Sequence, residues 1–218
     1  MSRFIITSGP TREYFDPIRF LSNPSTGRMG HSIAQAAIAH GHEVIYISGP
    51  VAEEFSRVQG ATNISIVSTL DLLAAVEKSI APGSILIMAA APADYRPEIK
   101  SPIKLKKTES PQLRLVPNPD ILKCMAEKNK SMHPPAVLIG FAAETHDTER
   151  YAREKLVSKS LDMIFLNDVS KSGVGFASTS NEITLFFKNG DRMDLPMEKK
   201  ETLGEKIIVE ISRMIHNR

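Results

Sequence analysis

The sequence predicts an α/β fold: a doubly wound, mostly parallel, Rossmann-like sheet with a small C-terminal β-hairpin addition. Short apolar runs alternate with segments of helical periodicity over the first 170 residues, as in parallel sheets covered by helices on both faces. After that the rhythm changes, because two strand-like segments flank Lys188-Asn-Gly-Asp, a hairpin turn signal. The chain contains no internal repeat, so we expect a single domain over residues 1–218.

The expected strands are short runs of apolar and β-branched residues. These runs lie at residues 4–7, 43–48, 63–68, 84–90, 136–142 and 163–166, with the hairpin strands at 182–187 and 192–195. The run at 84–90 (SILIMAA) is apolar throughout, which is typical of a strand buried on both faces of a parallel sheet.

The expected helices lie between these strands. Residues 27–40 carry apolar side chains at helical spacing and end at Gly41, a suitable residue to follow a helix. Asn118 is a candidate N-cap for another helix, with Pro119 in its first turn. Basic residues 100–111 lack apolar periodicity and are expected to form a loop. The remaining helices are expected at 53–58, 69–80, 148–160 and 199–215.

Composition and charge exclude several classes of protein. The 27 basic and 25 acidic residues leave a net charge of +2, which is too balanced to indicate nucleic-acid or membrane binding. Cys124 is the one cysteine, so no disulfide within the chain and no CxxC metal pair is expected. The apolar run at the N-terminus is too short for a signal peptide or a membrane span. We therefore expect a cytoplasmic protein.

Four unusual polar segments follow predicted strands. They are residues 7–30, 88–97, 140–145 and 167–170. In open α/β sheets ligands bind beyond the carboxyl ends of the strands, so the sequence predicts a ligand site where these four segments converge.

The segment Ser25-Thr-Gly-Arg-Met-Gly30 precedes a predicted helix. A helix N-terminus offers free backbone N–H groups and a partial positive charge, which favour phosphate. Gly27 and Gly30 would let a ligand or a neighbouring strand approach the backbone. The alternative is ordinary capping by Ser25 or Thr26, with glycines chosen for packing. A GxxG spacing alone does not decide between them.

Two further polar residues are candidates, each with a structural alternative. The amide of Asn23 could donate to a carboxylate or carbonyl oxygen, although Asn before proline often only initiates a turn. Asp94 follows a run of small residues and could bind a hydroxyl, a metal ion or an amide, or simply cap a turn.

Basic and aromatic candidates lie nearby in the predicted fold. Lysines cluster at Lys100 and Lys104-Leu-Lys-Lys107; a closing loop with such lysines can neutralise charge on a triphosphate, but a solvated surface is the usual reading. Phe141 and Asn167 sit at predicted strand ends, where they could contact a base or serve the fold. Lys155 and Lys159 share one helix face.

No residue stands out as a covalent catalyst. The six histidines show no metal-ligand spacing, and GxSxG is absent. Cys124 lies within a predicted helix and suits a small core residue. We therefore predict no metal site of protein ligands, and expect reactivity to come from a nucleotide bound with Mg²⁺.

Together the segments resemble phosphopantothenate–cysteine ligase of coenzyme A biosynthesis. The matching motifs are TSGPTRE, DPIRFLSNPSTGRMG, AAAPADYRP, KLKK, NPDIL, GFAAET and NDVS…GVGF, in the order of the family and over nearly the whole chain. The resemblance implies that 4′-phosphopantothenate and L-cysteine are joined through an acyl-nucleotidylate, with CTP converted to CMP and pyrophosphate in bacterial members. Eukaryotic members generally prefer ATP, and we expect CTP here.

The resemblance also implies roles for individual residues. Asn23 would hold and polarise the reacting carboxylate, and Lys104 would stabilise charge from a mobile loop. Ala90, Ala91 and Asp94 would line the phosphopantothenate site. The positions implied to bind the nucleotide are Gly9, Ser25, Gly27, Gly30, Asp94, Lys104, Pro119, Asp120, Ile121, Leu122, Phe141, Lys155, Lys159 and Asn167.

Assembly is a further implication of the resemblance. Arg19 would reach the substrate of a second subunit, so a homodimer with shared active sites is expected. Many bacterial members carry the ligase behind a flavin-dependent decarboxylase domain. We expect no flavin and no fused decarboxylase domain within these 218 residues. A stand-alone ligase and a piece of a bifunctional protein both remain open, as does association with a separate decarboxylase. Two positions depart from the family pattern: Pro92 stands where valine is common, and Arg28 where lysine is common.

Two other functions remain open from the residues alone. A nicotinamide-dependent oxidoreductase could use the same sheet, but GxGxxG is missing and no acidic residue follows the second predicted strand, which ends at Ser48. A non-catalytic nucleotide-binding module would leave the lysine loop as a plain surface.

Overall fold

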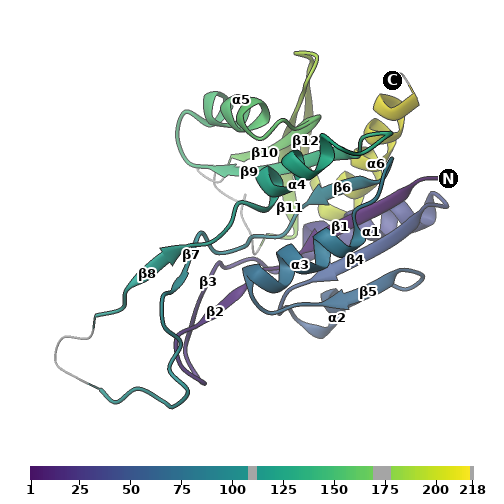
Figure 1. Cartoon of the computed structure of the whole chain (residues 1–218). Helices are drawn as coiled ribbons and strands as arrows, with labels where there is room; N and C mark the ends of the chain where they lie inside the picture. The colour runs from purple at the N-terminus through teal and green to yellow at the C-terminus, as the bar shows by residue number, and fades with distance from the viewer. Residues whose placement is uncertain (108–111, 169–177, 217–218) are drawn as a thin grey trace.

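The computed structural model describes residues 1–107, 112–168 and 178–216. Its centre is an eight-stranded sheet in the order β12-β11-β10-β9-β6-β1-β4-β5 (Figure 1). The strands are β1 (Arg3–Ser8), β4 (Glu43–Ser48), β5 (Thr62–Ser65), β6 (Ile85–Met88), β9 (Val137–Glu144), β10 (Met163–Asp168), β11 (Ser180–Phe187) and β12 (Arg192–Lys199). Parts of two predicted features, the basic loop at 108–111 and the last motif at 169–176, lie outside the described residues.

Six of these strands are parallel and follow the Rossmann order. β1 pairs in parallel with β4 on one side and with β6 on the other, and β5 and β9 continue the sheet outward. Numbered along the chain, the parallel strands therefore run 3-2-1-4-5-6, with the direction of winding reversing between β1 and β6. This reversal is the topological switch point at which such sheets bind ligands. The predicted fold class is confirmed.

The C-terminal hairpin is longer than expected. β11 and β12 each span eight residues, and β11 joins the main sheet by antiparallel pairing with β10. The register of the hairpin shifts between Asn181 and Ile183. The extra residue is on β12, which advances from Leu195 to Glu198 while β11 advances from Asn181 to Ile183. It interrupts the alternation of side chains after Leu195, which explains why sequence periodicity ended the second hairpin strand there.

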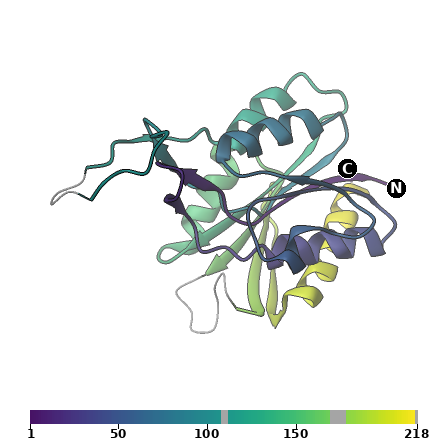
Figure 2. The ribbon, with the colours of Figure 1, turned by 90° about the horizontal axis from the view of Figure 1, so that it is seen from below.

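Helices cover both faces of the sheet: α1 (Arg28–Ala39), α2 (Glu53–Ser56), α3 (Thr69–Ser79), α4 (Ile121–Asn129), α5 (Thr148–Ser158) and α6 (Lys200–His216). Figure 2 shows α1 and α6 on one side and α3 and α4 on the other. Two buried clusters result, one with Phe4 and Ile6 of β1 under α1 and α6, the other with Ile5 under α3, α4 and α5. Among the described residues, the helices include none suited in length and hydropathy to cross a membrane.

Local sequence signals explain most helix ends. Gly41 follows α1 with a φ of 76°, as expected for a left-handed residue after a helix. Ser68 and Asp71 form a capping box at the start of α3. The N-cap of α4 is Asp120, which accepts from the backbone N–H of Lys123, so the expectation of Asn118 as cap was wrong. The Asn118 amide instead donates to the carbonyl of Ala93 at 2.9 Å.

Two short hairpins extend from the body as an arm. They pair β2 (Arg12–Tyr14) with β3 (Phe20–Ser22), and β7 (Tyr95–Pro97) with β8 (Leu115–Pro117). We call the described residues 12–22, 95–107 and 112–117 the arm (Figure 1). Sequence analysis treated these segments as loops, because three-residue strands are too short to show a periodicity.

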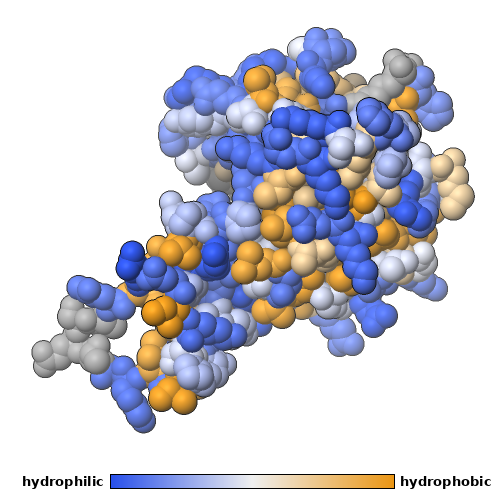
Figure 3. Space-filling model, in the orientation of Figure 1, coloured by the Kyte–Doolittle hydropathy of each residue, from blue (hydrophilic) through white to orange (hydrophobic). Residues whose placement is uncertain are grey.

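The arm exposes apolar side chains to solvent, as Figure 3 shows. Ile99 is 78% exposed and Ile103 is 72% exposed. The other large exposed apolar residues of the arm are Ile18, Phe20, Tyr95, Leu105, Leu113 and Leu115. A cluster of this kind is typical of an interaction surface.

The two helices on one face lie in very close contact at Gly204. A Cβ atom added to Gly204 of α6 would lie 2.8 Å from the carbonyl carbon and oxygen of Ser32 in α1. Because these are backbone atoms, they cannot rotate away, and the helices can approach this closely only with glycine at this position.

We predict that Gly204→Ala lowers the free energy of unfolding by about 1–3 kcal/mol through overpacking. The loss should appear even though Ala favours a helix over Gly by about 1 kcal/mol. Chemical denaturation measures the change, with Thr202→Ala on the exposed side of α6 as the control. Equal stability of the two variants would contradict the close contact.

Candidate active site

A cavity of about 600 Å³ lies at the switch point of the sheet. Its wall includes residues that follow β6, the first turn of α1, the N-terminus of α4 and parts of β9, β10 and β11. Most of the predicted site residues line it: Asn23, Ser25, Gly27, Gly30, Ala90, Ala91, Asp94, Pro119, Asp120, Ile121, Leu122, Phe141, Lys159 and Asn167. Gly9, Arg19, Lys104 and Lys155 do not.

The small residues after β6 are held in place by backbone hydrogen bonds. The N–H of Ala90 donates to Thr7 Oγ1 at 3.1 Å, and the N–H of Ala91 donates to the carbonyl of Gly9 at 2.9 Å. The N–H of Ala93 donates to Thr11 Oγ1 at 3.0 Å. β1 and the residues after it therefore fix one side of the cavity, and the short side chains leave it open.

Asn23 connects two segments of the cavity wall. Its Nδ2 donates to the carbonyl oxygens of Ala91 at 3.2 Å and of Pro92 at 3.0 Å. Both N–H groups of the amide are thus engaged with the protein in this structure. To donate to a substrate carboxylate, Asn23 would have to exchange one of these bonds for the new one.

The N-terminus of α1 faces the cavity without a side-chain cap. Gly27 is its N-cap residue, with a left-handed φ of 79°, and no side chain of the described residues caps the helix. Ser25 and Thr26 make only long contacts with this N-terminus: Ser25 Oγ accepts from the N–H of Gly27 at 3.4 Å, and Thr26 Oγ1 accepts from the N–H of Arg28 at 3.5 Å. The positive end of the helix dipole still faces the cavity wall, where it favours an anion.

The two glycines of this segment also serve the packing of α1 on β1. A Cβ atom on Gly30 would lie 2.7 Å from Cβ of Ser8 and 2.9 Å from the carbonyl oxygen of Thr7. Ser8 Oγ donates to the carbonyl of Gly27 at 2.7 Å. Close packing, the structural alternative for these glycines, is thus present together with an N-terminus that faces the cavity.

The opposite wall carries an ion pair and an aromatic ring. Lys159 Nζ lies 3.0 Å from Asp120 Oδ2, whereas Lys155 Nζ lies 2.6 Å from Glu144 Oε1, outside the cavity. Phe141 packs edge-on against Phe165, with ring centroids 4.8 Å apart. Phe141 therefore both closes the core and lines the cavity.

Two asparagine side chains on the wall carry unused hydrogen-bonding capacity. Among the described residues, Oδ1 of Asn167 and Oδ1 of Asn181 are buried without a hydrogen-bond partner. An unpaired buried polar atom costs about 1–3 kcal/mol. A ligand in the cavity that donates a hydrogen bond to either oxygen would recover part of this free energy.

Lys200 is a buried lysine on the same wall. It is 3% exposed and is the first residue of α6. Burial and the like charge of Arg28 outweigh the attraction of Glu201 and lower the pKa of Lys200 to about 8. At neutral pH the ammonium is therefore still mostly charged.

Arg19 and the lysine segment meet on the arm, at the buried carboxylate of Asp16. Arg19 donates to Asp16 from its backbone N–H and from its guanidinium, and the N–H of Leu105 donates to Asp16 at 3.2 Å. Burial works against ionisation, but the hydrogen bonds from Arg19, Ile18 and Leu105 hold the pKa of Asp16 far below its ordinary value. Lys104 is exposed beside this anchor.

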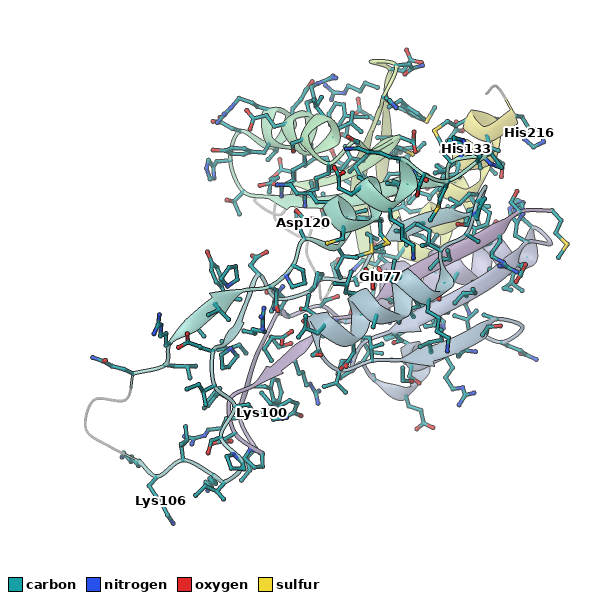
Figure 4. The ribbon with its side chains drawn as sticks, in the orientation of Figure 1. Glu77, Lys100, Lys106, Asp120, His133 and His216 are labelled. Atoms are coloured by element: carbon teal, nitrogen blue, oxygen red, sulfur yellow. The ribbon has the colours of Figure 1, made fainter. Side chains whose placement is uncertain are left out.

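Figure 4 shows the lysine segment relative to the start of α4. Lys100 and Lys106 lie on the arm, whereas Asp120 lies at the start of α4 on the cavity wall (Figure 4). No group of three or more His, Cys, Asp or Glu side chains within the described ranges could hold a metal ion.

Comparison with known proteins identifies the family. A profile of the family described as DNA/pantothenate metabolism flavoprotein C-terminal domain matches residues 1–215. The chain belongs to this family. It is 42% identical over 212 residues to the coenzyme A biosynthesis bifunctional protein CoaBC of Bacillus subtilis (strain 168), covering 96% of this chain and 51% of that protein. The chain spans about half the length of the curated relatives it matches.

Solved structures of similar proteins share the fold. The crystal structure of the C-terminal domain of a CoaBC protein has a TM-score of 0.80 and 35% identity, covering 100% of this chain and 97% of that chain. A Cab2 mutant in complex with phosphopantothenate-cysteine has a TM-score of 0.74, covering 99% of this chain and 88% of that chain. At 15% identity, the second likeness shows the fold alone.

For this member of the flavoprotein C-terminal domain family, sequence reasoning missed part of the cavity wall. Arg28 and Pro92 were noted without a role, and Lys200 and Asn181 were not singled out. The other wall residues that were not predicted are Thr26, Met29, Thr69, Met88, Ala89, Ala93, Asn118, Ala142 and Ala143. The lysine at the start of a helix was the available signal for Lys200, since a basic residue there opposes the helix dipole.

Asp16 supports the arm in this family member, and we predict that Asp16→Asn lowers the Tm at pH 7. Because the pKa of Asp16 is depressed in the fold, its contribution is present above pH 4 and is lost as the pH falls below that value. The difference in Tm between variant and wild type should shrink between pH 4 and pH 2.5. Thermal unfolding followed by circular dichroism measures it.

The control for Asp16 is Glu127→Gln, which removes an exposed ion pair with Lys130. This variant should change the Tm little, because exposed pairs contribute about 0–1 kcal/mol. A Tm difference for Asp16→Asn that stays constant with pH would contradict the assigned pKa direction.

Proposed function

We propose that this chain is a phosphopantothenate–cysteine ligase domain of coenzyme A biosynthesis. One observation carries the proposal: in a member of this family, the residues implied by the ligase resemblance converge on one cavity at the switch point, beside the uncapped N-terminus of α1. The 42% identity to a coenzyme A biosynthesis bifunctional protein supports the same pathway.

The proposed reaction has two steps. A carboxylate oxygen of 4′-phosphopantothenate attacks the α-phosphorus of CTP, and pyrophosphate leaves with the electron pair of the broken P–O bond. The amine of L-cysteine then attacks the activated carbonyl, loses a proton and expels CMP. Both steps depend on alignment and on stabilisation of negative charge more than on a protein nucleophile, which fits the absence of an evident nucleophile among the described wall residues.

Nucleotide binding is assigned to both sides of the cavity. In this proposal Ser25, Gly27 and Gly30 present the N-terminus of α1 to the phosphates. Phe141 and Asn167 flank the nucleoside, and the α4 segment from Pro119 to Leu122 completes the pocket together with Lys159. Gly9 acts indirectly, since its carbonyl holds the N–H of Ala91, and Lys155 orients the end of β9 through Glu144.

The acyl substrate is assigned to the wall formed after β6. Ala90 and Ala91 leave room beside the backbone, and Asn23 is positioned next to them to polarise the reacting carboxylate. Asp94, also on this wall, is the carboxylate best suited to contact Mg²⁺ bound to the nucleotide, because Mg²⁺ commonly takes one or two carboxylates plus phosphate oxygens. CTP is the proposed nucleotide, in preference to ATP.

Assembly as a homodimer is part of the proposal. The exposed apolar side chains of the arm would be covered by a second subunit. Arg19 and Lys104 lie on this arm and not on the cavity wall, which suits residues that serve a shared active site. Association with a separate decarboxylase and a cytoplasmic location are proposed on the basis of the family resemblance alone.

The decisive assay for the ligase is pyrophosphate release. We expect the chain with Mg·CTP and 4′-phosphopantothenate to release pyrophosphate, and to form 4′-phosphopantothenoylcysteine when L-cysteine is added. ATP in place of CTP tests the nucleotide preference. Absence of release with either nucleotide would refute the ligase, and oxidation of NAD(P)H would favour the oxidoreductase alternative, which the comparisons do not favour.

Lys104→Gln should slow the reaction without affecting the fold. Loss of one preorganised charge contact typically removes about 2–4 kcal/mol of transition-state stabilisation, so kcat should fall roughly 30- to 1,000-fold. The Tm should not change, because Lys104 is exposed. Lys106→Gln, two residues along the same segment, is the matched control. Equal kcat values of the two variants would show that Lys104 is an ordinary surface lysine with no part in the reaction.

A further inference from the structure

Glu13 is a buried carboxylate that the proposed reaction does not use. It lies in β2 at the base of the arm and is 4% exposed. Its Oε1 accepts from the backbone N–H and from Oγ1 of Thr69, the first residue of α3, each at 2.8 Å. The start of α3 already has a capping box from Ser68 and Asp71, so the helix does not need Glu13 as a cap. The position of this carboxylate calls for another explanation.

A chain of buried hydroxyl groups leads from Glu13 to the cavity wall. Thr69 Oγ1 lies 3.0 Å from Thr11 Oγ1, and Thr11 Oγ1 accepts from the backbone N–H of Ala93 at 3.0 Å. Both threonines are buried. Because Thr69 and Ala93 line the cavity, the chain connects the base of the arm to the wall formed after β6.

The carboxylate fixes the direction of each hydrogen bond in this chain. The hydroxyl of Thr69 has one proton. It goes to Glu13 Oε1 at 2.8 Å in preference to the carbonyl oxygen of Ala93 at 3.4 Å, because a carboxylate is the stronger acceptor. Thr69 Oγ1 must then accept from Thr11. With its own proton given to Thr69, Thr11 Oγ1 holds a lone pair toward the N–H of Ala93, and hydrogen bonds in one direction strengthen one another.

The segment around Ala93 carries groups to which the proposed reaction assigns roles. Asn23 donates to the carbonyl oxygens of Ala91 and Pro92, immediately before Ala93. Asp94 immediately follows it and lines the same cavity. A shift of the Ala93 backbone would therefore move both the support of the Asn23 amide and the Asp94 carboxylate.

We propose that Glu13 is a positioning residue for the acyl-substrate wall, and that it acts through Thr69 and Thr11 on the backbone of Ala93. Glu13 itself contacts no substrate. The carboxylate orders the two hydroxyl protons, and these hold the wall in the conformation that receives the carboxylate of the substrate. The inference deepens the proposed function and rests on it for the identity of the substrate.

The first test is amide hydrogen exchange at Ala93, followed by NMR in the whole chain. Glu13→Ala should speed this exchange about tenfold or more, as for the loss of about one hydrogen bond, because the proton of Thr69 is then free to turn to other acceptors. Glu13→Gln keeps an acceptor oxygen and should exchange nearly as slowly as the wild type. Glu98→Ala removes an exposed carboxylate of the arm, paired with Arg114, and is the matched control with unchanged exchange.

The second test is steady-state kinetics of the proposed reaction. For Glu13→Ala, kcat/KM for 4′-phosphopantothenate should fall about 10- to 100-fold with a rise in its KM, the cost of a reacting group displaced by about 1 Å. The KM for Mg·CTP should stay close to the wild-type value, because the contacts assigned to the nucleotide lie mostly on α1, α4 and β9. Glu13→Gln should restore most of the activity.

A second variant interrupts the chain at another point. Thr11→Val removes the acceptor of the Ala93 N–H and leaves Glu13 in place. It should reproduce both the faster exchange at Ala93 and the selective rise in the KM for 4′-phosphopantothenate. Should Glu13→Ala fail to fold, Thr11→Val decides.

The outcomes separate the positioning role from the proposed function. Unchanged exchange at Ala93 in a folded Glu13→Ala would overturn the inference. Faster exchange with unchanged kcat/KM would also overturn it, as would equal rises in both KM values together with a lower Tm, since each result indicates a role in stability alone. A wild type that releases no pyrophosphate refutes the ligase, and exchange at Ala93 in the same variants then still decides whether Glu13 positions the wall.

Discussion

The close packing of α1 against β1 is the constraint on which the rest of the site depends. Gly30 leaves no space for even a Cβ beside Ser8 and Thr7, and Ser8 holds the carbonyl of Gly27. The first turn of α1 is thereby fixed at the carboxyl end of the central strand, where the winding of the sheet reverses. A helix seated less closely would direct its dipole away from the cavity, and the proposed phosphate site would lose a source of positive potential.

Helix α1 also positions α6, which packs against it. α6 approaches α1 at Gly204, and this contact brings Lys200, one turn earlier, to the cavity. The C-terminal hairpin completes the arrangement, because β11 carries Asn181 and the end of β12 leads directly into α6. The hairpin is therefore more than an extension of the sheet edge. It supplies Asn181 to the cavity wall, from a part of the chain distant from the polar segments after β1 and β6.

The arm carries two predicted site residues that do not line the cavity, Arg19 and Lys104. Asp16 accepts hydrogen bonds from Arg19 and from the backbone N–H of Leu105. Arg19, which the resemblance implies to reach a second subunit, is therefore held next to the lysine segment. Exposed apolar side chains surround this contact. Separation of Lys104 from the cavity wall within one subunit is consistent with a site completed by movement of the arm or by a second copy of the chain.

The sequence by itself determined the parallel sheet and most of the cavity. Apolar runs such as Ile85–Met88, and the polar segments that follow them, can be recognised locally in the sequence. Parallel strands have their carboxyl ends at the same edge of the sheet, so the polar segments that follow them come together there. The three-residue strands of the arm escaped prediction because they show no periodicity. Tertiary structure alone decided that Asp120 caps α4 in place of Asn118, and that Lys200 and Asn181 line the same cavity as Arg28. These contacts join segments far apart in the chain, and their geometry depends on helix packing, which no local pattern of residues records.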